Sequence, residues 1–110
     1  MATPLAERRC VVCRPGTPTL PDQEVKRLLE QLDGWQVEGA LLIKTVRFKG
    51  FMPGVRLVDR IAEVAEAEGH HPDLHLSYGS LRIELTTHAA GGLTEKDFIL
   101  AAKIDRLLPA

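Results

Sequence analysis

Apolar runs, basic clusters and cysteines are all scarce in this sequence, and each shortage argues against a class of protein. No apolar run approaches the roughly 20 residues needed to span a bilayer, and the N-terminus lacks the charged-then-apolar pattern of a signal peptide. The formal net charge is −1 without a cluster of Lys and Arg, so we expect no direct binding to nucleic acid. These features predict a cytoplasmic protein that does not associate with membranes.

The two cysteines, Cys10 and Cys13, form a single C-x-x-C pair near the N-terminus. A structural zinc site usually needs four ligands, and no second pair of this kind is present. A thioredoxin-type motif would follow a strand in a βαβ unit, whereas this pair precedes any clear element. We interpret the pair as reduced and non-catalytic, and a zinc site shared between subunits is the alternative.

The remaining composition is typical of one small globular domain. The chain has 110 residues, of which 45% are hydrophobic and 26% charged, so it is neither disordered nor long enough for two ordinary domains. Aromatic residues make up only 5%, and the core must therefore consist mainly of Leu, Ile, Val and Ala. A short chain buries a smaller fraction of its surface than a larger protein does, and self-association would cover more of its apolar area.

Proline and glycine divide the N-terminal part of the chain. Residues 1–20 contain three prolines and one glycine, and we predict that they form an irregular extension to a domain at residues 21–110. A helix begins at Pro21, because proline suits the first turn and apolar residues follow at helical spacing. Gly34 ends this helix.

Two strands and a second helix follow. Residues 35–38 and 41–48 flank a Gly-Ala pair, which predicts a tight hairpin. The Leu41–Leu42–Ile43 run puts apolar side chains on both faces of its strand, so we expect an oligomer to cover the outward face. Between residues 53 and 68 the apolar period becomes helical.

Two more strands and a third helix complete the pattern. Residues 74–78 and 81–86 alternate between apolar and polar side chains around a Gly-Ser turn. A variant capping box, Thr94-x-x-Asp97, then opens a helix that continues to Leu108. The order α-ββ-α-ββ-α predicts an α+β fold: a two-layer sandwich in which a four-stranded antiparallel sheet carries three helices on one face.

All four histidines lie within 19 residues, at His70, His71, His75 and His88. Pro72 keeps the preceding His71 extended, so the adjacent pair occupies a sharp exit from the second helix. His88 is at the end of the last strand and falls in the alternating positions that polar residues occupy, which argues against a buried core histidine. A solvated loop is the alternative interpretation of the adjacent pair.

Metal binding is the main rival use of these side chains, because three histidines could supply three zinc ligands. Adjacent histidines in an extended segment point in divergent directions, however, and no H-E-x-x-H spacing is present. Glu66, four residues before His70, is better suited to orient a histidine than to complete a metal site. We therefore expect no metal and no other cofactor.

A set of motifs in this order resembles the pterin-4a-carbinolamine dehydratases, also known as dimerisation cofactors of a homeodomain transcription factor. The set covers roughly residues 20–108. It comprises Gly34-Trp35, Phe48-Lys49-x-Phe51, Glu66-x-x-x-His70-His71-Pro72, Tyr78, Thr87-His88 and Gly92-Leu93-Thr94-x-x-Asp97. A lone His-His-Pro would be a weak signal, but the whole ordered set is specific.

The resemblance implies catalytic roles for His70, His71 and His88. It also implies a pterin pocket with substrate-binding residues Glu66, Pro72, Thr87, Trp35 and Asp97. Homodimers that pair into tetramers are implied as well. Gly50, Gly54 and Leu57 depart from the residues that members often have, namely Asp, Ala and Phe, which puts packing and oligomer contacts in doubt and leaves the histidines unaffected.

The implied activity is that of a hydro-lyase, 4a-hydroxytetrahydrobiopterin dehydratase, acting in tetrahydrobiopterin recycling. Its substrate is a tetrahydropterin with a hydroxyl on C4a, and its product is the quinonoid dihydropterin. Histidine can serve as both acid and base because it titrates near neutral pH. We expect His70 and His88 to be the acid–base pair, His71 to bind or relay a proton, and Glu66 to orient a neighbouring histidine. The alternative is a non-catalytic module on the same fold, a transcription coactivator or an assembly factor.

Overall fold

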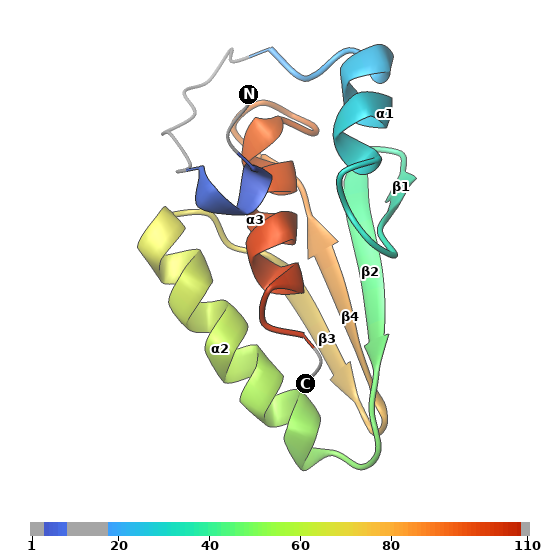
Figure 1. The fold of residues 1–110 in the computed structure, drawn as a ribbon, viewed down its shortest axis with the longest axis vertical. Coiled ribbons are helices and arrows are strands. Elements are labelled where there is room, and N and C mark those ends of the chain that lie inside the picture. Colours follow the sequence, from blue (N-terminus) through green and yellow to red (C-terminus); the bar gives the residue numbers. More distant parts are fainter. Residues whose placement is uncertain (1–3, 9–17, 109–110) are drawn as a thin grey trace.

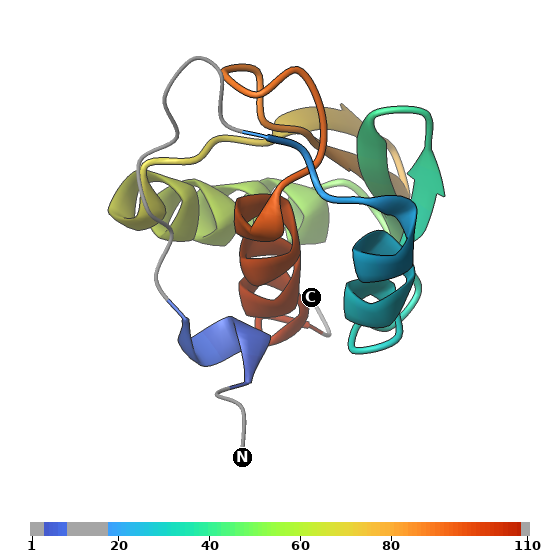
Figure 2. The ribbon, with the colours of Figure 1, turned by 90° about the horizontal axis from the view of Figure 1, so that it is seen from above.

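The structure, a computed structural model, describes residues 4–8 and 18–108. In these residues a four-stranded antiparallel sheet carries three α-helices on one face (Figures 1 and 2). The two-layer α+β fold and the element order predicted from the sequence are confirmed. Cys10 and Cys13 lie outside the described residues, so the interpretation of this pair stays a prediction.

The three helices are α1 (Asp22–Leu29), α2 (Met52–Glu68) and α3 (Glu95–Asp105). The first and third end earlier than apolar spacing predicts, because their last residues continue as tight turns rather than as helix. A left-handed glycine with a φ of 65° ends α2 at Gly69, as the sequence predicts. None of the described helices has the length and apolar character needed to cross a membrane.

The strands are β1 (Gln36–Glu38), β2 (Leu41–Arg47), β3 (Asp73–Ser77) and β4 (Ser80–Leu85). They lie in the order β1-β2-β4-β3, with every neighbouring pair antiparallel. Both predicted hairpins form, and in each a turn of two residues contains a glycine with positive φ. Positive φ is the conformation that such short turns need and that glycine adopts without strain.

The core lies between the sheet and the helices. Alternate residues of β4 face the helices and are fully buried, as expected for a strand with one covered face. Helix α3 supplies much of the opposing layer and runs along the middle of the sheet (Figure 1). The largest fully buried apolar side chains are Leu28, Leu42, Leu57, Ile61, Leu81, Ile83, Leu85, Phe98, Leu100 and Ile104.

The outer face of the sheet covers Ile43 without help from another chain. Leu42 belongs to the core, whereas Ile43 faces away from it and is nevertheless only 6% exposed. It pairs with Gln36 of β1 and Glu84 of β4, and these neighbours flank it on the same face. Ile43 by itself therefore does not require an oligomer, whereas Leu41 on the same face is half-buried, and the predicted self-association stays a prediction.

Gly54 lies in the first turns of α2 and is packed closely against two side chains. A Cβ atom at this position would lie 2.5 Å from Leu76 Cδ1 and 2.5 Å from Phe48 Cζ. The space that alanine would take at this position is therefore filled by Phe48 and Leu76 in this chain. The departure from the alanine that many members of the resembled family have at this position is matched by local packing between α2 and the sheet.

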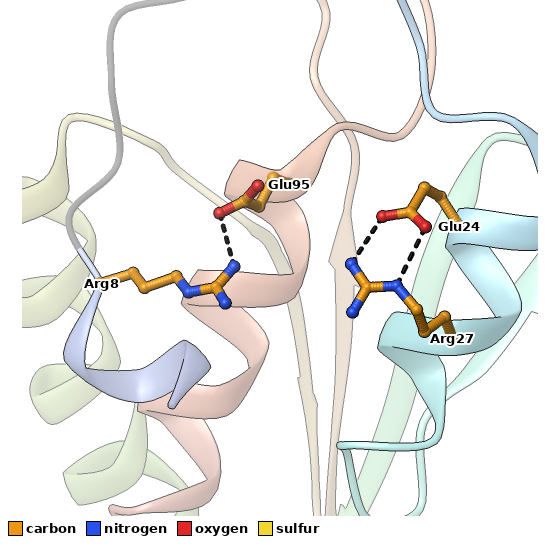
Figure 3. Close-up of polar contacts among 4 residues, drawn as sticks. All are labelled: Arg8, Glu24, Arg27 and Glu95. Carbon is orange, nitrogen blue, oxygen red and sulfur yellow. Dashed lines mark hydrogen bonds and ion pairs between the residues drawn. The ribbon is translucent and has the colours of Figure 1, made fainter. Parts of the chain in front are cut away.

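A short 3₁₀ turn, Leu5–Glu7, packs against α3. Leu5 is 3% exposed and part of the core, while Lys103 Nζ donates a 2.8 Å hydrogen bond to the carbonyl of Ala6. Arg8 forms a 2.9 Å ion pair with Glu95 at the start of α3 (Figure 3). This part of the predicted irregular extension is therefore attached to the domain.

Candidate functional site

The turn after α2 directs the two adjacent histidines in different directions. The Gly69 amide bonds to the carbonyl of Glu66 and the His70 amide to the carbonyl of Ala65, the paired bonds of a Schellman motif. Because this motif reverses the chain, His70 leaves the helix and turns toward the start of α3. Pro72 then leads into β3, one of the two edge strands of the sheet.

His70 forms a buried pair with Asp97. Its Nε2 lies 2.6 Å from Asp97 Oδ1, and the two residues are 8% and 0% exposed. The separation is that of a short hydrogen bond. The predicted site residues His70 and Asp97 are thus in direct contact, although 27 positions separate them in the sequence.

Asp97 is held by a network at the N-terminus of α3. Its Oδ2 accepts a 2.9 Å bond from the Thr94 amide and another 2.9 Å bond from the Thr87 hydroxyl. The hydroxyls of Thr87 and Thr94 lie 2.8 Å apart. A carboxylate at a helix N-terminus is stabilised by the exposed amides of the first turn. Asp97 therefore anchors the helix and the histidine at once.

Thr94 is a member of the site that the sequence analysis did not include. Its signal was present, because Thr94-x-x-Asp97 was predicted as a capping box, and the structure confirms that Asp97 caps the helix. What the motif does not indicate is that the capping carboxylate also accepts a hydrogen bond from Thr87 and contacts His70. A helix cap and a functional site share one side chain.

Glu66 lies beside His71 rather than His70. Glu66 Oε1 is 3.5 Å from His71 Nε2, and the two side chains are 79% and 58% exposed. Such an exposed pair contributes little to stability. His70 does not share a helical face with Glu66, because Gly69 ends the helix before that turn is complete.

His88 is exposed in a turn and does not end a strand as predicted. Strand β4 stops at Leu85, and a bridge between Thr87 and Gly92 closes the turn that contains His88. Since Thr87 is bonded to Asp97, the turn is fixed to the same network as His70. His88 therefore follows directly on a residue of the site and faces solvent.

Trp35 contacts a different part of α3. Its indole Nε1 donates a 2.9 Å hydrogen bond to Asp105 Oδ1, and the same oxygen accepts a 2.8 Å bond from Lys44 Nζ. Asp105 is eight residues beyond Asp97 in α3, about 12 Å along the helix axis at 1.5 Å per residue. No hydrogen bond joins Trp35 to the histidine network within the described residues, and its predicted role in substrate binding stays a prediction.

The fourth histidine, His75, lies on the outer face of the sheet. Its Nε2 is 3.3 Å from Glu84 Oε1, and Arg82 Nε donates a 2.7 Å bond to Glu84 Oε2. The Arg82 bond, and after it the contact with His75, lower the pKa of the Glu84 carboxyl below its ordinary value. His75 has partners of its own and is not part of the network around Asp97.

The arrangement can move protons. The buried imidazole of His70, oriented beside a carboxylate, is suited to general acid or base catalysis. Two exposed histidines adjoin the network in the sequence: His71 follows His70, and His88 follows Thr87. Among the side chains of residues 4–8 and 18–108, no three His, Cys, Asp or Glu residues gather in a way that would hold a metal ion.

Comparison with known proteins identifies the family. A profile described as pterin 4 alpha carbinolamine dehydratase matches residues 18–107. The chain belongs to this dehydratase family. A family member from Nitrosomonas eutropha is 45% identical over 105 residues, covering 94% of this chain and 93% of its own length. One from Rubrobacter xylanophilus is 44% identical, with 94% and 97% covered.

Solved structures of dehydratase relatives have the same fold. A transcriptional coactivator/pterin dehydratase from Brucella melitensis has a TM-score of 0.79 at 29% identity, over 83% of this chain and 99% of its own. A pterin dehydratase-like protein identified as a RuBisCO assembly factor in the alpha-carboxysome has a TM-score of 0.56 at 23% identity, over 69% and 88%. The second likeness concerns the fold alone.

Proposed function

We propose that this family member is an active 4a-hydroxytetrahydrobiopterin dehydratase that serves tetrahydrobiopterin recycling in the cytoplasm, as a homodimer or homotetramer. The observation that carries the proposal is the buried 2.6 Å pair of His70 and Asp97. Orientation of a histidine by a carboxylate is a recurring requirement of acid–base catalysis.

The reaction removes water and involves no redox change. An acid protonates the hydroxyl on C4a, which leaves as water when the C4a–O bond breaks. A base takes the proton from N5, and the N5–H electron pair forms the C4a=N5 double bond. Two histidines can perform both transfers, and we assign them to His70 and His88. His71, with Glu66 beside it, binds the substrate or relays a proton, and Pro72 lines the pocket.

The proposal is tested by assaying dehydration of chemically generated 4a-hydroxytetrahydropterin. We expect His70→Gln and His88→Ala to reduce kcat/KM by about 10²–10⁴-fold, the usual contribution of a positioned acid or base. Glutamine at position 70 retains a donor for Asp97, which protects the fold. His75→Ala is the matched control, since His75 lies on the outer sheet face, and it should leave activity unchanged.

The same assay separates the rival functions. Activity should survive exhaustive chelation, because proton transfer needs no metal, whereas loss on chelation and recovery with zinc would favour a metalloprotein. A wild-type protein that is folded by circular dichroism but has no dehydratase activity would favour the non-catalytic coactivator or assembly module. Full activity of a folded His70→Gln, His88→Ala double variant would contradict the assignment of the acid–base pair.

A further inference from the structure

We propose that Lys103 is a positioning residue of the dehydratase site, and that it makes the N-terminal turn Leu5–Glu7 part of what holds His70 in place. This role rests on the proposed function, because His70 belongs to the proposed site. The ammonium group of Lys103 contacts the end of α2 and the N-terminal turn at once.

Lys103 joins three elements of the fold. From α3 its Nζ donates a 2.8 Å hydrogen bond to the carbonyl of Ala6 in the N-terminal turn, and it lies 4.0 Å from Glu68 Oε2 at the end of α2. The Lys103 and Glu68 side chains are only 16% and 7% exposed, so water and salt screen their attraction less than at an exposed ion pair. We call these two contacts the Lys103 bridge.

Helix α3 holds the end of α2 at two points, on either side of one glycine. Before Gly69, Glu68 lies opposite Lys103. After it, His70 contacts Asp97 across 2.6 Å. The two residues of α3 are six positions apart, about 9 Å along the helix axis. A single contact would let the end of α2 pivot, whereas two separated contacts fix its direction as well as its position.

The glycine makes the first of these contacts important for the second. Gly69 has a φ of 65°, and glycine leaves the backbone more freedom than any other residue. The direction in which the chain leaves α2 therefore depends on what holds the residues on either side. Asp97 restrains the ring of His70, and the Lys103 bridge restrains the backbone from which that side chain departs.

The N-terminal turn limits where the Lys103 side chain can go. Leu5 is 3% exposed and packs in the core, which holds the neighbouring carbonyl of Ala6 beside α3. A lysine side chain has many rotamers, and a free one would lose entropy on settling near a carboxylate. Because the hydrogen bond to Ala6 already restricts these rotamers, the N-terminal turn pre-organises the contact with Glu68.

The position of His70 matters because proton transfer needs hydrogen-bond reach between the imidazole and the substrate. A displacement of about 1 Å can reduce a rate about 10²-fold. Without the Lys103 bridge, His70 keeps its contact with Asp97 but departs from a less restrained backbone. We therefore expect a loss in kcat, with little change in substrate binding.

Lys103→Met tests the bridge, because methionine keeps an unbranched apolar stem and removes the ammonium group. In the dehydration of 4a-hydroxytetrahydropterin we expect kcat about tenfold lower and KM within about twofold. Lys103→Arg keeps a cation and its donors and should restore most of kcat. Lys26→Met, at an exposed position of α1, is the matched control and should leave both values unchanged.

Hydrogen exchange of the His70 amide gives a readout that does not depend on activity. This amide donates to the carbonyl of Ala65, so it exchanges when the end of α2 opens. We expect about tenfold faster exchange in Lys103→Met, with a smaller change at the β4 amides, which report opening of the core. Equal acceleration at both places would overturn the positioning role, because it would indicate a general loss of stability.

Leu5→Ala tests the part played by the N-terminal turn. The truncation loosens the packing that holds Ala6, so we expect lower kcat and faster His70 exchange. In combination with Lys103→Met it should add little, since both changes act on the same bridge. Additive effects on kcat would overturn the role of the turn.

Two outcomes separate the inference from the proposed function. Unchanged kcat and unchanged His70 exchange in folded Lys103→Met would overturn the inference and leave an active dehydratase. Local loosening of His70 in Lys103→Met, when the wild-type protein has no dehydratase activity, would overturn the proposed function and the positioning role with it.

Discussion

Replacing Asp105 with alanine separates a structural role of Trp35 from a role at the active site. One carboxylate oxygen of Asp105, Oδ1, accepts hydrogen bonds from the indole N–H of Trp35 and from the ammonium group of Lys44. Trp35 is 5% exposed, so the variant leaves a buried donor unpaired, at a cost of about 1–3 kcal/mol. Loss of the Lys44 contact adds about 0.2–1 kcal/mol or less, because Lys44 keeps its 2.7 Å bond to the carbonyl of Asp33.

The helix dipole makes a smaller contribution of opposite sign to the free energy of unfolding. Asp105 is the last residue of α3, where a negative charge opposes the helix dipole, and its removal returns roughly 0.3–1 kcal/mol. The free energy of unfolding should therefore fall by about 2 kcal/mol in Asp105→Ala, which lowers Tm by roughly 8 °C in a domain of this size. In Asp105→Asn the carbonyl still accepts from Trp35, and the lost ion pair and the relieved dipole nearly cancel.

Denaturation followed by indole fluorescence measures this directly, since Trp35 is the only tryptophan. Dehydratase activity of the folded Asp105→Ala protein should stay within about twofold of wild type, because no hydrogen bond joins Trp35 or Asp105 to the network around Asp97 among the described residues. A tenfold loss of rate would correspond to about 1.4 kcal/mol of lost transition-state stabilisation. Asp59→Asn, at an exposed position of α2, is the control. A large loss of activity with unchanged stability would refute the reasoning and would support the predicted role of Trp35 in substrate binding.

Three further outcomes are expected. Gly54→Ala should lower the free energy of unfolding by about 1 kcal/mol in chemical denaturation, since overpacking against Phe48 and Leu76 costs about 1–3 kcal/mol and helix propensity returns up to roughly 1 kcal/mol. Arg82→Gln should raise the pKa of Glu84 toward its ordinary value in an NMR titration. Because the native pKa is lowered, the stabilisation from Glu84 is present above the unfolded-state pKa and is lost as pH falls through the native one. Light scattering at micromolar concentration should report a dimer or tetramer, and a stable, active monomer would contradict this.

The prediction of an oligomer gains a second candidate surface. One reason for the prediction was the outward face of the Leu41–Ile43 run, in which Ile43 is buried within the single chain and Leu41 is half-buried. Among residues 4–8 and 18–108, the large apolar side chains that remain exposed are Phe51, Met52 and Tyr78, at 45%, 54% and 80%. Hydrogen bonds from Phe48 to Gly79 and from Gly79 to Gly50 hold their two loops together. These residues therefore share one end of the sheet, and exposed apolar patches of this kind mark association surfaces.

Local patterns determined the elements of this protein. Period-2 alternation predicted β3 and β4, helical spacing predicted α2, and glycines predicted both hairpin turns. These signals are readable because they depend on neighbours a few residues apart. Boundaries were less exact, and Tyr78 lies in the turn after β3 instead of in the strand, because alternation continues past the last paired residue.

The sequence also brought the histidines into one region, but only the tertiary structure decided their partners. Glu66 is four residues from His70 and pairs with His71, since the left-handed Gly69 turns His70 back toward α3. The partner of His70 is Asp97, 27 residues away, and that of Trp35 is Asp105, 70 residues away. Spacing determines which side chains share a helix face or strand face, whereas contacts between elements depend on how the layers pack. Packing therefore made a helix-capping carboxylate the anchor of the site.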